Sequence, residues 1–320
     1  MCTAISYSAD THYFGRNLDL DRDYGQQVTI VPRNFPLCGR ARHEAIIGMA
    51  TLSHGYPLFF EGTNESGLSV AALNFPGNAV YHKAAEGKEN IASYDFIPYV
   101  LTRCQSCEDA KALLYRAVVC DRAFSEDLPV TPLHWLIADK AQSLVAESTA
   151  DGLQLYDNPI GALTNNPPFP FHRDHFALHM ALSRDEAENR IAPSLPLKPI
   201  SLGLGAMGLP GDYSSPSRFL RAATLRRWWA ERGMTCTEEA GGGGDFPLSQ
   251  FFTVLGAVSP TAGAVMTPAG GCHRTLYTCC MDTGRGVYHY RTEGEAIVRS
   301  VSFCGPDLNG ESLWTVGSQA

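Results

Sequence analysis

The sequence has no run of Lys or Arg, no long apolar segment and no internal repeat. Its 33 acidic residues outnumber its 25 Lys and Arg residues, for a formal net charge of -8, which argues against a nucleic-acid or anionic-lipid surface. The first ten residues lack the basic and apolar regions of a secretory signal, and no stretch is long enough to span a bilayer. We therefore expect a cytoplasmic protein with a small-molecule substrate and with neither nucleic acid nor membrane as partner.

The ten cysteines are scattered through 320 residues, unlike the dense framework of a small disulfide-bonded domain. Most of them should be reduced and buried, as small apolar residues. The tract at 238–245 contains four consecutive glycines, which predicts a flexible loop. No Gly-Lys-Ser or Gly-Lys-Thr follows it, so it does not match a phosphate-binding loop.

With 44% apolar residues, the chain can bury a sizeable core, and we expect one domain over residues 1–320. Short runs rich in β-branched and aromatic residues predict strands, whereas apolar residues at helical spacing predict helices. Strands, then helices, then strands again, without strict alternation, favour an α+β fold with helices stacked on sheets. The strands are expected at 3–7, 28–32, 45–49, 67–74, 133–139, 275–281, 286–290 and 296–302, and the helices at 93–103, 106–119 and 216–232.

Cys2 directly follows the initiator Met, and a small second residue permits removal of Met1. Cys2 would then carry both a thiol and a free α-amine. An α-amine has a pKa of about 7.7–8.0 and a thiol one of about 8.5, so the amine can take the thiol proton near neutral pH. This is the chemistry of an N-terminal nucleophile in acyl transfer.

Arg16 and Asp19 lie in the segment FGRNLD at 14–19, which follows a stretch that could pair as a hairpin with the first strand. A guanidinium beside the sulfur would favour the thiolate, and a carboxylate bound to the amine would hold it in place. From spacing alone, an exposed Arg and an Asp in a turn remain the favoured alternative.

Seven sequence blocks occur in the order found in the choloylglycine hydrolase family, which the chain resembles over most of its length. They are MCT at 1–3, FGRNLD at 14–19, PRNF at 32–35, ALNFP at 72–76, LHW at 133–135, LTNNP at 163–167, and GLPGD at 208–212 followed by SRF at 217–219. The resemblance implies the four-layer αββα sandwich of N-terminal nucleophile hydrolases. It also implies Cys2 as nucleophile, Arg16 and Asp19 as its partners, Asn74 and Asn165 beside the developing oxyanion, and Arg218 as a further cation.

Within that family the chain is similar to bile salt hydrolases in having Asn at position 74, where penicillin V acylases often have Tyr. The implied activity is hydrolysis of glycine- or taurine-conjugated bile salts without metal or other cofactor, with penicillin V or another acyl amide as the alternative substrate. The resemblance also implies a homo-oligomer, most commonly a homotetramer. The apolar side chains in segments where the family builds its sterol pocket are Leu18, Tyr24, Phe59, Phe60, Leu128 and Leu133; ordinary core packing is the alternative for some of them.

Three other readings are weaker. Residues 202–208 contain Gly-x-Gly-x-x-Gly, but Pro210 follows at once and the acidic residue about 20 positions later is missing, so we expect a loop at the active-site rim rather than a dinucleotide site. His172, His175 and His179 would share one face of a helix over 170–182, which leaves a metal-dependent hydrolase open. A catalytically inactive bile-acid binder is the third reading, and the intact set around Cys2 argues against it.

Overall fold

The computed structural model of the protein describes residues 1–231 and 246–316. The glycine-rich tract at 238–245 lies outside these residues, so the loop expected there stays a prediction.

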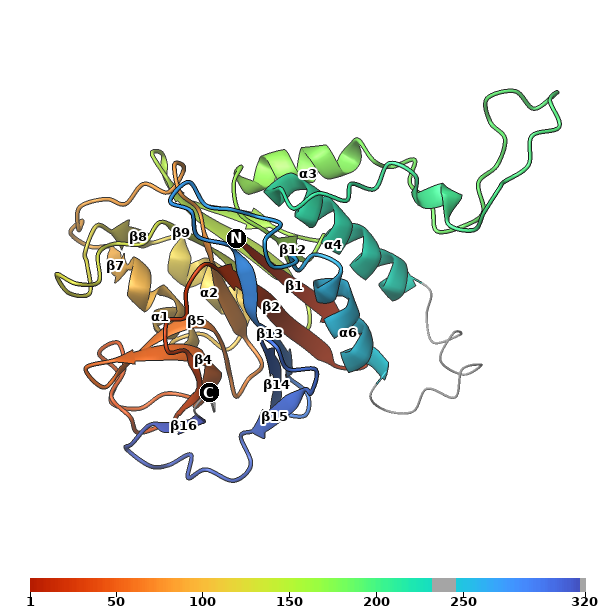
Figure 1. The fold of residues 1–320 in the computed structure, drawn as a ribbon. Coiled ribbons are helices and arrows are strands. Elements are labelled where there is room, and N and C mark those ends of the chain that lie inside the picture. The colour runs from red at the N-terminus through yellow and green to blue at the C-terminus, as the bar shows by residue number, and fades with distance from the viewer. Residues whose placement is uncertain (232–245, 317–320) are drawn as a thin grey trace.

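Two sheets stand face to face at the centre of the molecule (Figure 1). The first has six antiparallel strands in the order β12-β1-β2-β13-β14-β15. Its strands are β1 (Cys2–Ser8), β2 (His12–Leu20), β12 (Ala162–Leu163), β13 (Arg274–Asp282), β14 (Val287–Thr292) and β15 (Arg299–Ser302). Strand β2 pairs with β1 from His12 to Leu18, so a hairpin is present near the chain start and extends into the segment at 14–19.

The second sheet has eight antiparallel strands in the order β11-β10-β9-β6-β5-β4-β3-β16. Its strands are β3 (Gln27–Val31), β4 (Ile46–Ser53), β5 (Tyr56–Asn64), β6 (Ser69–Asn74), β9 (Leu133–Ala138), β10 (Ser143–Thr149), β11 (Gly152–Asp157) and β16 (Trp314–Val316). Strands β1 and β2 of the first sheet contact β6 of the second, so β6 lies directly behind the chain start.

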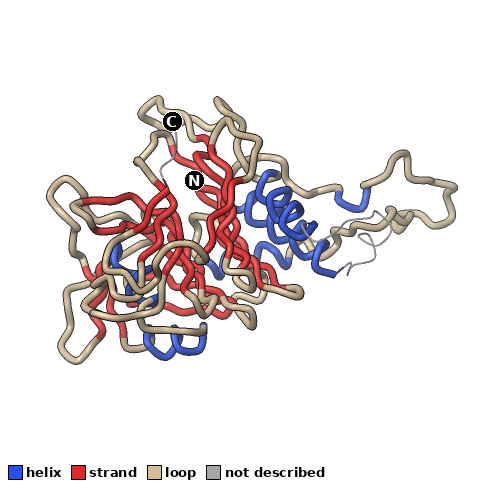
Figure 2. Tube along the Cα trace, turned by 90° about the horizontal axis from the view of Figure 1, so that it is seen from below, coloured by secondary structure: helices blue, strands red, loops and turns tan. Residues whose placement is uncertain are grey.

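Helices cover the outer face of each sheet (Figures 1 and 2). Helix α1 (Phe96–Leu101) packs on β5 and β6, and α2 (Cys107–Leu114) lies nearby against β11 and the short strand β8 (Ala117–Cys120). On the other side α4 (Ser215–Glu231) packs on β1 and β12, α6 (Phe246–Gly256) packs on β2 and β13, and α3 (Phe169–Ala177) lies against α4. Helix, sheet, sheet and helix form the predicted αββα sandwich.

The helix predicted over 106–119 is shorter than expected. Ser106 caps its start by accepting from the backbone N–H of Asp109, and the helix ends at Leu114. The chain then forms β8 (Ala117–Cys120), which pairs in parallel with β7 (Glu89–Ala92). The β-branched pair Val118 and Val119 favours a strand, and this local preference outweighs the helical spacing of the apolar residues before it.

The eight-stranded sheet separates two apolar cores. The inner core lies toward the first sheet and contains Cys2 and Leu18, and the outer core lies toward α1. In the outer core Phe96 stacks on Trp135 with ring centroids 3.8 Å apart, and both side chains are fully buried. Two opposite faces of one sheet are thus apolar, as a sandwich with helices outside requires.

The chain between α3 and α4 forms an arm that extends well away from the sandwich (Figure 1). It contains the short 3-10 helix η2 (Leu204–Ala206) within the Gly-x-Gly-x-x-Gly segment. The expected loop is therefore present, without the strand and long helix that a dinucleotide site needs. Its expected place at the active-site rim is wrong, because the backbone N–H of Ser183 donates to the carbonyl of Gly205 and ties the segment to the arm.

Candidate active site

The hairpin of β1 and β2 distributes the predicted catalytic residues over both faces of the first sheet. Cys2 pairs with Leu18 and Ala4 with Arg16, and directly paired residues share a face. Cys2 and Arg16 therefore lie on the inner face, toward the second sheet. Asp19 lies on the opposite face, toward the helices, because successive residues of a strand alternate.

Gly15 allows this hairpin to approach β13 closely. A Cβ atom at Gly15 would lie 1.9 Å from the carbonyl oxygen of Cys279, which is far inside the contact distance of real atoms. Any other residue at this position would push β2 away from β13 and displace Arg16, the next residue along the strand.

Asn165 and Arg218 hold the main chain of Cys2. The N–H of Cys2 donates to Asn165 Oδ1 at 2.8 Å, and the Arg218 guanidinium donates to the Cys2 carbonyl and, at 2.8 Å, to Asn165 Oδ1. It also donates to Thr3 Oγ1 at 2.7 Å and to the Tyr213 carbonyl at 3.0 Å. Burial lowers the pKa of Arg218, while Asp19 and Cys2 oppose that change. The atom that becomes the α-amine on removal of Met1 is thus fixed in place.

The orientation of the Asn165 amide follows from its partners, because a guanidinium only donates and Oδ1 must face it. Its Nδ2 donates to the backbone carbonyl of Asn74 at 2.8 Å. In this arrangement Asn165 Oδ1 accepts from the Cys2 nitrogen, and one of the two N–H donors of Asn165 is occupied. The side-chain amide of Asn74 has no hydrogen-bond partner among the described residues, so Asn74 is the freer donor of the two.

Two buried histidines fix the strand end that carries Asn165. His134 Nε2 lies 2.8 Å from the Thr164 carbonyl oxygen and His172 Nε2 lies 2.8 Å from that of Asn165. The Nδ1 of His134 lies 3.0 Å from Glu147 Oε1. These contacts define the role of the LHW block and account for one of the three histidines that the sequence suggested as a metal group.

Arg16 is fully buried and donates to the backbone carbonyls of Phe60, at 3.1 Å, and Ala72. Its Nη2 atom has no partner among the described residues. Burial works against its charge, yet Cys2, Tyr277 and Glu61 together raise the pKa of Arg16 above its usual value. A permanent cation with one free N–H group therefore lies on the thiol's face of the sheet.

Asp19 receives a hydrogen bond from Thr275 Oγ1 at 2.7 Å, and its Oδ2 atom has no partner among the described residues. Burial raises the pKa of Asp19, and Arg218 and Thr275 oppose the rise. The Met1 amine donates to the Asp19 carbonyl at 2.6 Å and lies 2.9 Å from His273 Nδ1. Burial lowers the pKa of both this amine and His273. Sequence reasoning missed Thr275 and His273, since both come from the distant strand β13 or the residue before it.

The six predicted pocket residues do not form one group. Tyr24 and Phe60 meet with ring centroids 6.3 Å apart, and Leu18 lies in the inner core with Cys2. Phe59 belongs to the outer core, and Leu133 packs against that core. Leu128 is exposed. Core packing explains Phe59 best, and the pocket role of the other five residues stays a prediction.

The three histidines do not gather as a metal site. Helix α3 ends at Ala177, so His179 lies beyond it, and His172 is bound to the Asn165 carbonyl. Within residues 1–231 and 246–316, no three His, Cys, Asp or Glu side chains are arranged to hold a metal ion. In the same ranges, no helix has the length and apolarity needed to cross a membrane.

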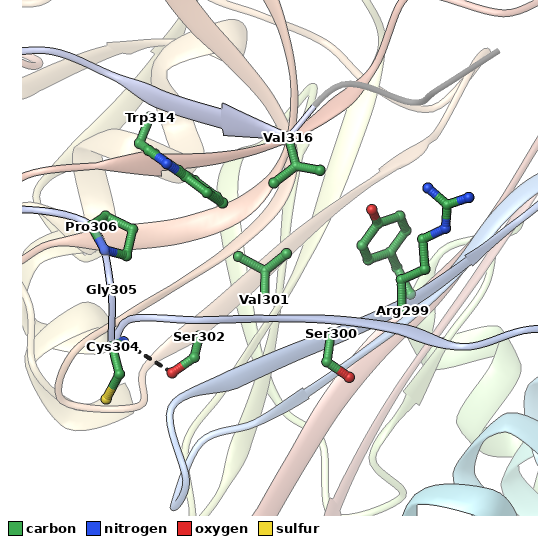
Figure 3. A pocket seen from close by; sticks show the side chains of 10 residues that line it. Arg299, Ser300, Val301, Ser302, Cys304, Gly305, Pro306, Trp314 and Val316 are labelled. Atoms are coloured by element: carbon green, nitrogen blue, oxygen red, sulfur yellow. Dashed lines mark hydrogen bonds between the residues drawn. The ribbon is translucent and has the colours of Figure 1, made fainter.

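Three hollows of the surface lie away from Cys2. Figure 3 shows one of about 440 Å³ between β15 and β16, lined by residues that include Tyr290, Val301, Trp314 and Val316. None of the six predicted catalytic residues lines any of these three hollows. The candidate site is therefore defined by side-chain convergence at the chain start.

An αββα sandwich with a cysteine at the start of its first central strand defines an N-terminal nucleophile hydrolase. The family model "Linear amide C-N hydrolases, choloylglycine hydrolase family" matches residues 2–316. The chain belongs to this family, as its seven sequence blocks predicted.

Named relatives agree. The bile salt hydrolase/transferase of Lactiplantibacillus plantarum is 40% identical over 320 residues, covering 98% of this chain and 94% of the relative. A crystal structure of a variant of conjugated bile acid hydrolase from Clostridium perfringens is 32% identical with a TM-score of 0.90, covering 99% and 97% of the two chains. Penicillin V acylase from Agrobacterium tumefaciens, 18% identical with a TM-score of 0.73 and 99% and 91% coverage, shares the fold.

Proposed function

We propose that the chain hydrolyses the amide bond of glycine- or taurine-conjugated bile salts, with Cys2 as nucleophile after removal of Met1. The observation that carries the proposal is the convergence on Cys2. Its nitrogen is fixed by Asn165 and Arg218, and a buried Arg16 with a free N–H group lies on its thiol face. Relatives named as bile salt or conjugated bile acid hydrolases support the choice of substrate.

The mechanism begins with transfer of the thiol proton of Cys2 to its own α-amine. The thiolate attacks the amide carbonyl, a carbon–sulfur bond forms, and the carbonyl oxygen becomes negatively charged. Collapse of this intermediate breaks the carbon–nitrogen bond, and the α-ammonium gives its proton to the departing glycine or taurine. Water then attacks the thioester and loses its proton to the α-amine. Collapse of this second intermediate breaks the carbon–sulfur bond and releases the free bile acid, and the α-ammonium returns its proton to the sulfur to restore the thiol.

Asn74 is the residue we assign to the oxyanion, because its side-chain amide is free to donate. Asn165 and Arg218 hold the amine, Asp19 places a negative charge on the amine's side of the sheet, and Arg16 stabilises the thiolate. Such preorganised groups favour charge that develops only in the transition state. Tyr24, Phe60 and Leu18 supply the apolar contacts for the sterol in this proposal.

The test measures release of glycine and taurine from glycocholate and taurocholate, with penicillin V assayed in parallel. We expect bile salt cleavage by the wild-type protein and none by Cys2→Ala. Cys104→Ala is the matched control, since Cys104 is buried against the outer core and should leave the activity intact. Cleavage of penicillin V alone would contradict the substrate, and activity in Cys2→Ala would contradict the nucleophile.

We further propose that the whole chain forms one amidase domain, supported by the family match over residues 2–316, and that it acts in the cytoplasm. We also propose a homotetramer. The arm between α3 and α4 carries exposed apolar side chains, which a second subunit would cover. They include those of Ile191, Leu197, Ile200 and Leu202. Analytical ultracentrifugation tests the assembly, and a monomer at micromolar concentration would contradict it.

A further inference from the structure

A β-bulge in β5 lies directly behind Arg16. Met49 of β4 pairs with Glu61 of β5, but the next residue, Ala50, pairs with Phe59, so Phe60 has no partner across the ladder. The carbonyl of Phe60 is thereby free to accept from Arg16 Nη1 at 3.1 Å. Bulges recur beside active sites because they redirect side chains and leave backbone groups available.

Glu61, the residue after the bulge, is buried and receives donors on both carboxylate oxygens. Tyr277 donates to Oε2 at 2.5 Å, Tyr288 donates to Oε1 at 2.6 Å, and the Met49 N–H lies 3.2 Å from Oε1. Burial raises the pKa of Glu61, and Arg16 and the two hydroxyls oppose that rise. Three donors around one buried group are the environment of an ionised carboxylate.

Glu61 Oε2 lies 3.9 Å from Arg16 Nε. At this separation the two charges attract each other without a close hydrogen bond, and the guanidinium keeps its Nη2 atom free. We propose that Glu61 is a positioning residue that holds Arg16 beside Cys2 and, through its own negative charge, offsets part of the stabilisation that Arg16 gives the Cys2 thiolate. The proposal rests on the assigned role of Cys2 as nucleophile.

The consequence is a balance of charge across Arg16. Arg16 favours the thiolate and the negative charge of Glu61 disfavours it, so neutralising Glu61 removes a repulsion from the sulfur. Tyr277 and Tyr288 of the first sheet and Cys279 of β13 also face this pair, while Asp19 and Arg218 act from the other face of the hairpin. None of these groups replaces the carboxylate next to Arg16.

The test measures the rate of Cys2 alkylation by iodoacetamide against pH, with mass spectrometry of the N-terminal peptide to separate Cys2 from the other thiols. In Glu61→Gln we expect the pH of half-maximal rate to fall, because the thiolate no longer lies near the negative charge of Glu61. Glu61→Asp should return it toward the wild-type value. Tyr288→Phe is the matched control, since it removes a hydrogen bond from the same carboxylate and keeps the charge, so the midpoint should stay.

An unchanged midpoint in Glu61→Gln, or an equal shift in Tyr288→Phe, would overturn the proposal. Alkylation of Cys2 needs no bile salt, so the two proposals are tested separately. A wild-type protein that cleaves no bile salt would refute the proposed function, and the alkylation midpoints would still decide the role of Glu61.

If Glu61→Gln does not fold, thermal unfolding of two other variants decides. Removing one partner of a buried ion pair is strongly destabilising, whereas replacing both is often tolerated. Arg16→Met with Glu61→Gln should therefore unfold at a higher temperature than Arg16→Met alone. A double variant no more stable than that single variant would show that Glu61 does not balance Arg16.

Discussion

Replacing Thr275 by Val tests whether Asp19 works as a buried carboxylate. Val keeps the shape of Thr and removes only the hydroxyl that donates to Asp19 Oδ1 at 2.7 Å. Because Asp19 Oδ2 has no partner among the described residues, the carboxylate would lose its one side-chain donor there. A hydrogen bond to a charged group contributes about 1.5–3 kcal/mol, so we expect a loss of that size in the free energy of unfolding at neutral pH.

The pH dependence gives the prediction its sign. Burial already raises the pKa of Asp19 above its unfolded value, and loss of Thr275 raises it further. A carboxyl group that binds its proton more tightly when folded makes stability fall as pH rises from the unfolded pKa to the folded pKa. The cost of Thr275→Val should therefore be large at neutral pH and smaller in acid, where Asp19 is protonated in both states. The acid limb of the pH–rate profile for bile salt hydrolysis should move to higher pH.

Thr278→Val is the control on the same strand. Thr278 donates to Asn17 Oδ1 at 2.8 Å, and Asn17 is neutral. This variant should lose only about 0.5–1.5 kcal/mol, with no dependence on pH and no change in the acid limb. Urea unfolding followed by tryptophan fluorescence at two pH values, together with pH–rate profiles, measures both effects. Equal and pH-independent losses in Thr275→Val and Thr278→Val would refute a charged Asp19.

Three further outcomes are expected. Asn74→Ala should lower kcat about 10²–10³-fold with a smaller effect on KM, as loss of an oxyanion donor does; an unchanged kcat would remove Asn74 from that role. Phe96→Ala should cost about 3–5 kcal/mol in urea unfolding, because Phe96 is fully buried against Trp135, yet leave activity per folded molecule intact. EDTA should leave bile salt hydrolysis unchanged, and inactivation reversed by added metal would contradict the thiol mechanism.

The sequence predicted the architecture well where local pattern decides it. The strands at 3–7, 28–32 and 133–139 and the helix at 216–232 correspond to β1, β3, β9 and α4 within a few residues, because their apolar or β-branched runs are bounded by clear turn residues. The predicted end of the helix at 106–119 was wrong, because Val118 and Val119 form β8 beside a strand that is distant in sequence. Pairing of this kind has no local signature.

The site was predictable only in part for a similar reason. Cys2, Arg16 and Asp19 lie in one hairpin, so their proximity follows from strand pairing, whereas Asn165 and Arg218 needed the family resemblance. Thr275 and Glu61 had no signal, because a single Thr or Glu in a strand usually faces solvent. Phe59 did carry a signal, as an aromatic residue in a predicted pocket segment, but the signal was misleading. In a strand with a bulge, simple alternation does not tell which of two adjacent aromatics faces the site.

The distribution of charge explains how one residue can supply both nucleophile and base inside a buried site. Arg16 Nε faces Glu61 Oε2 at 3.9 Å, and Arg218 opposes the rise in the pKa of Asp19 that burial causes. Transfer of the thiol proton to the α-amine creates a thiolate and an ammonium together and brings no net charge into the interior. The thiolate forms on the face that holds Arg16, and the ammonium forms beside Asn165, on the side of Asp19. Since each new charge meets a fixed partner of the opposite sign or an accepting oxygen, the transfer avoids the cost that an isolated buried ion would carry.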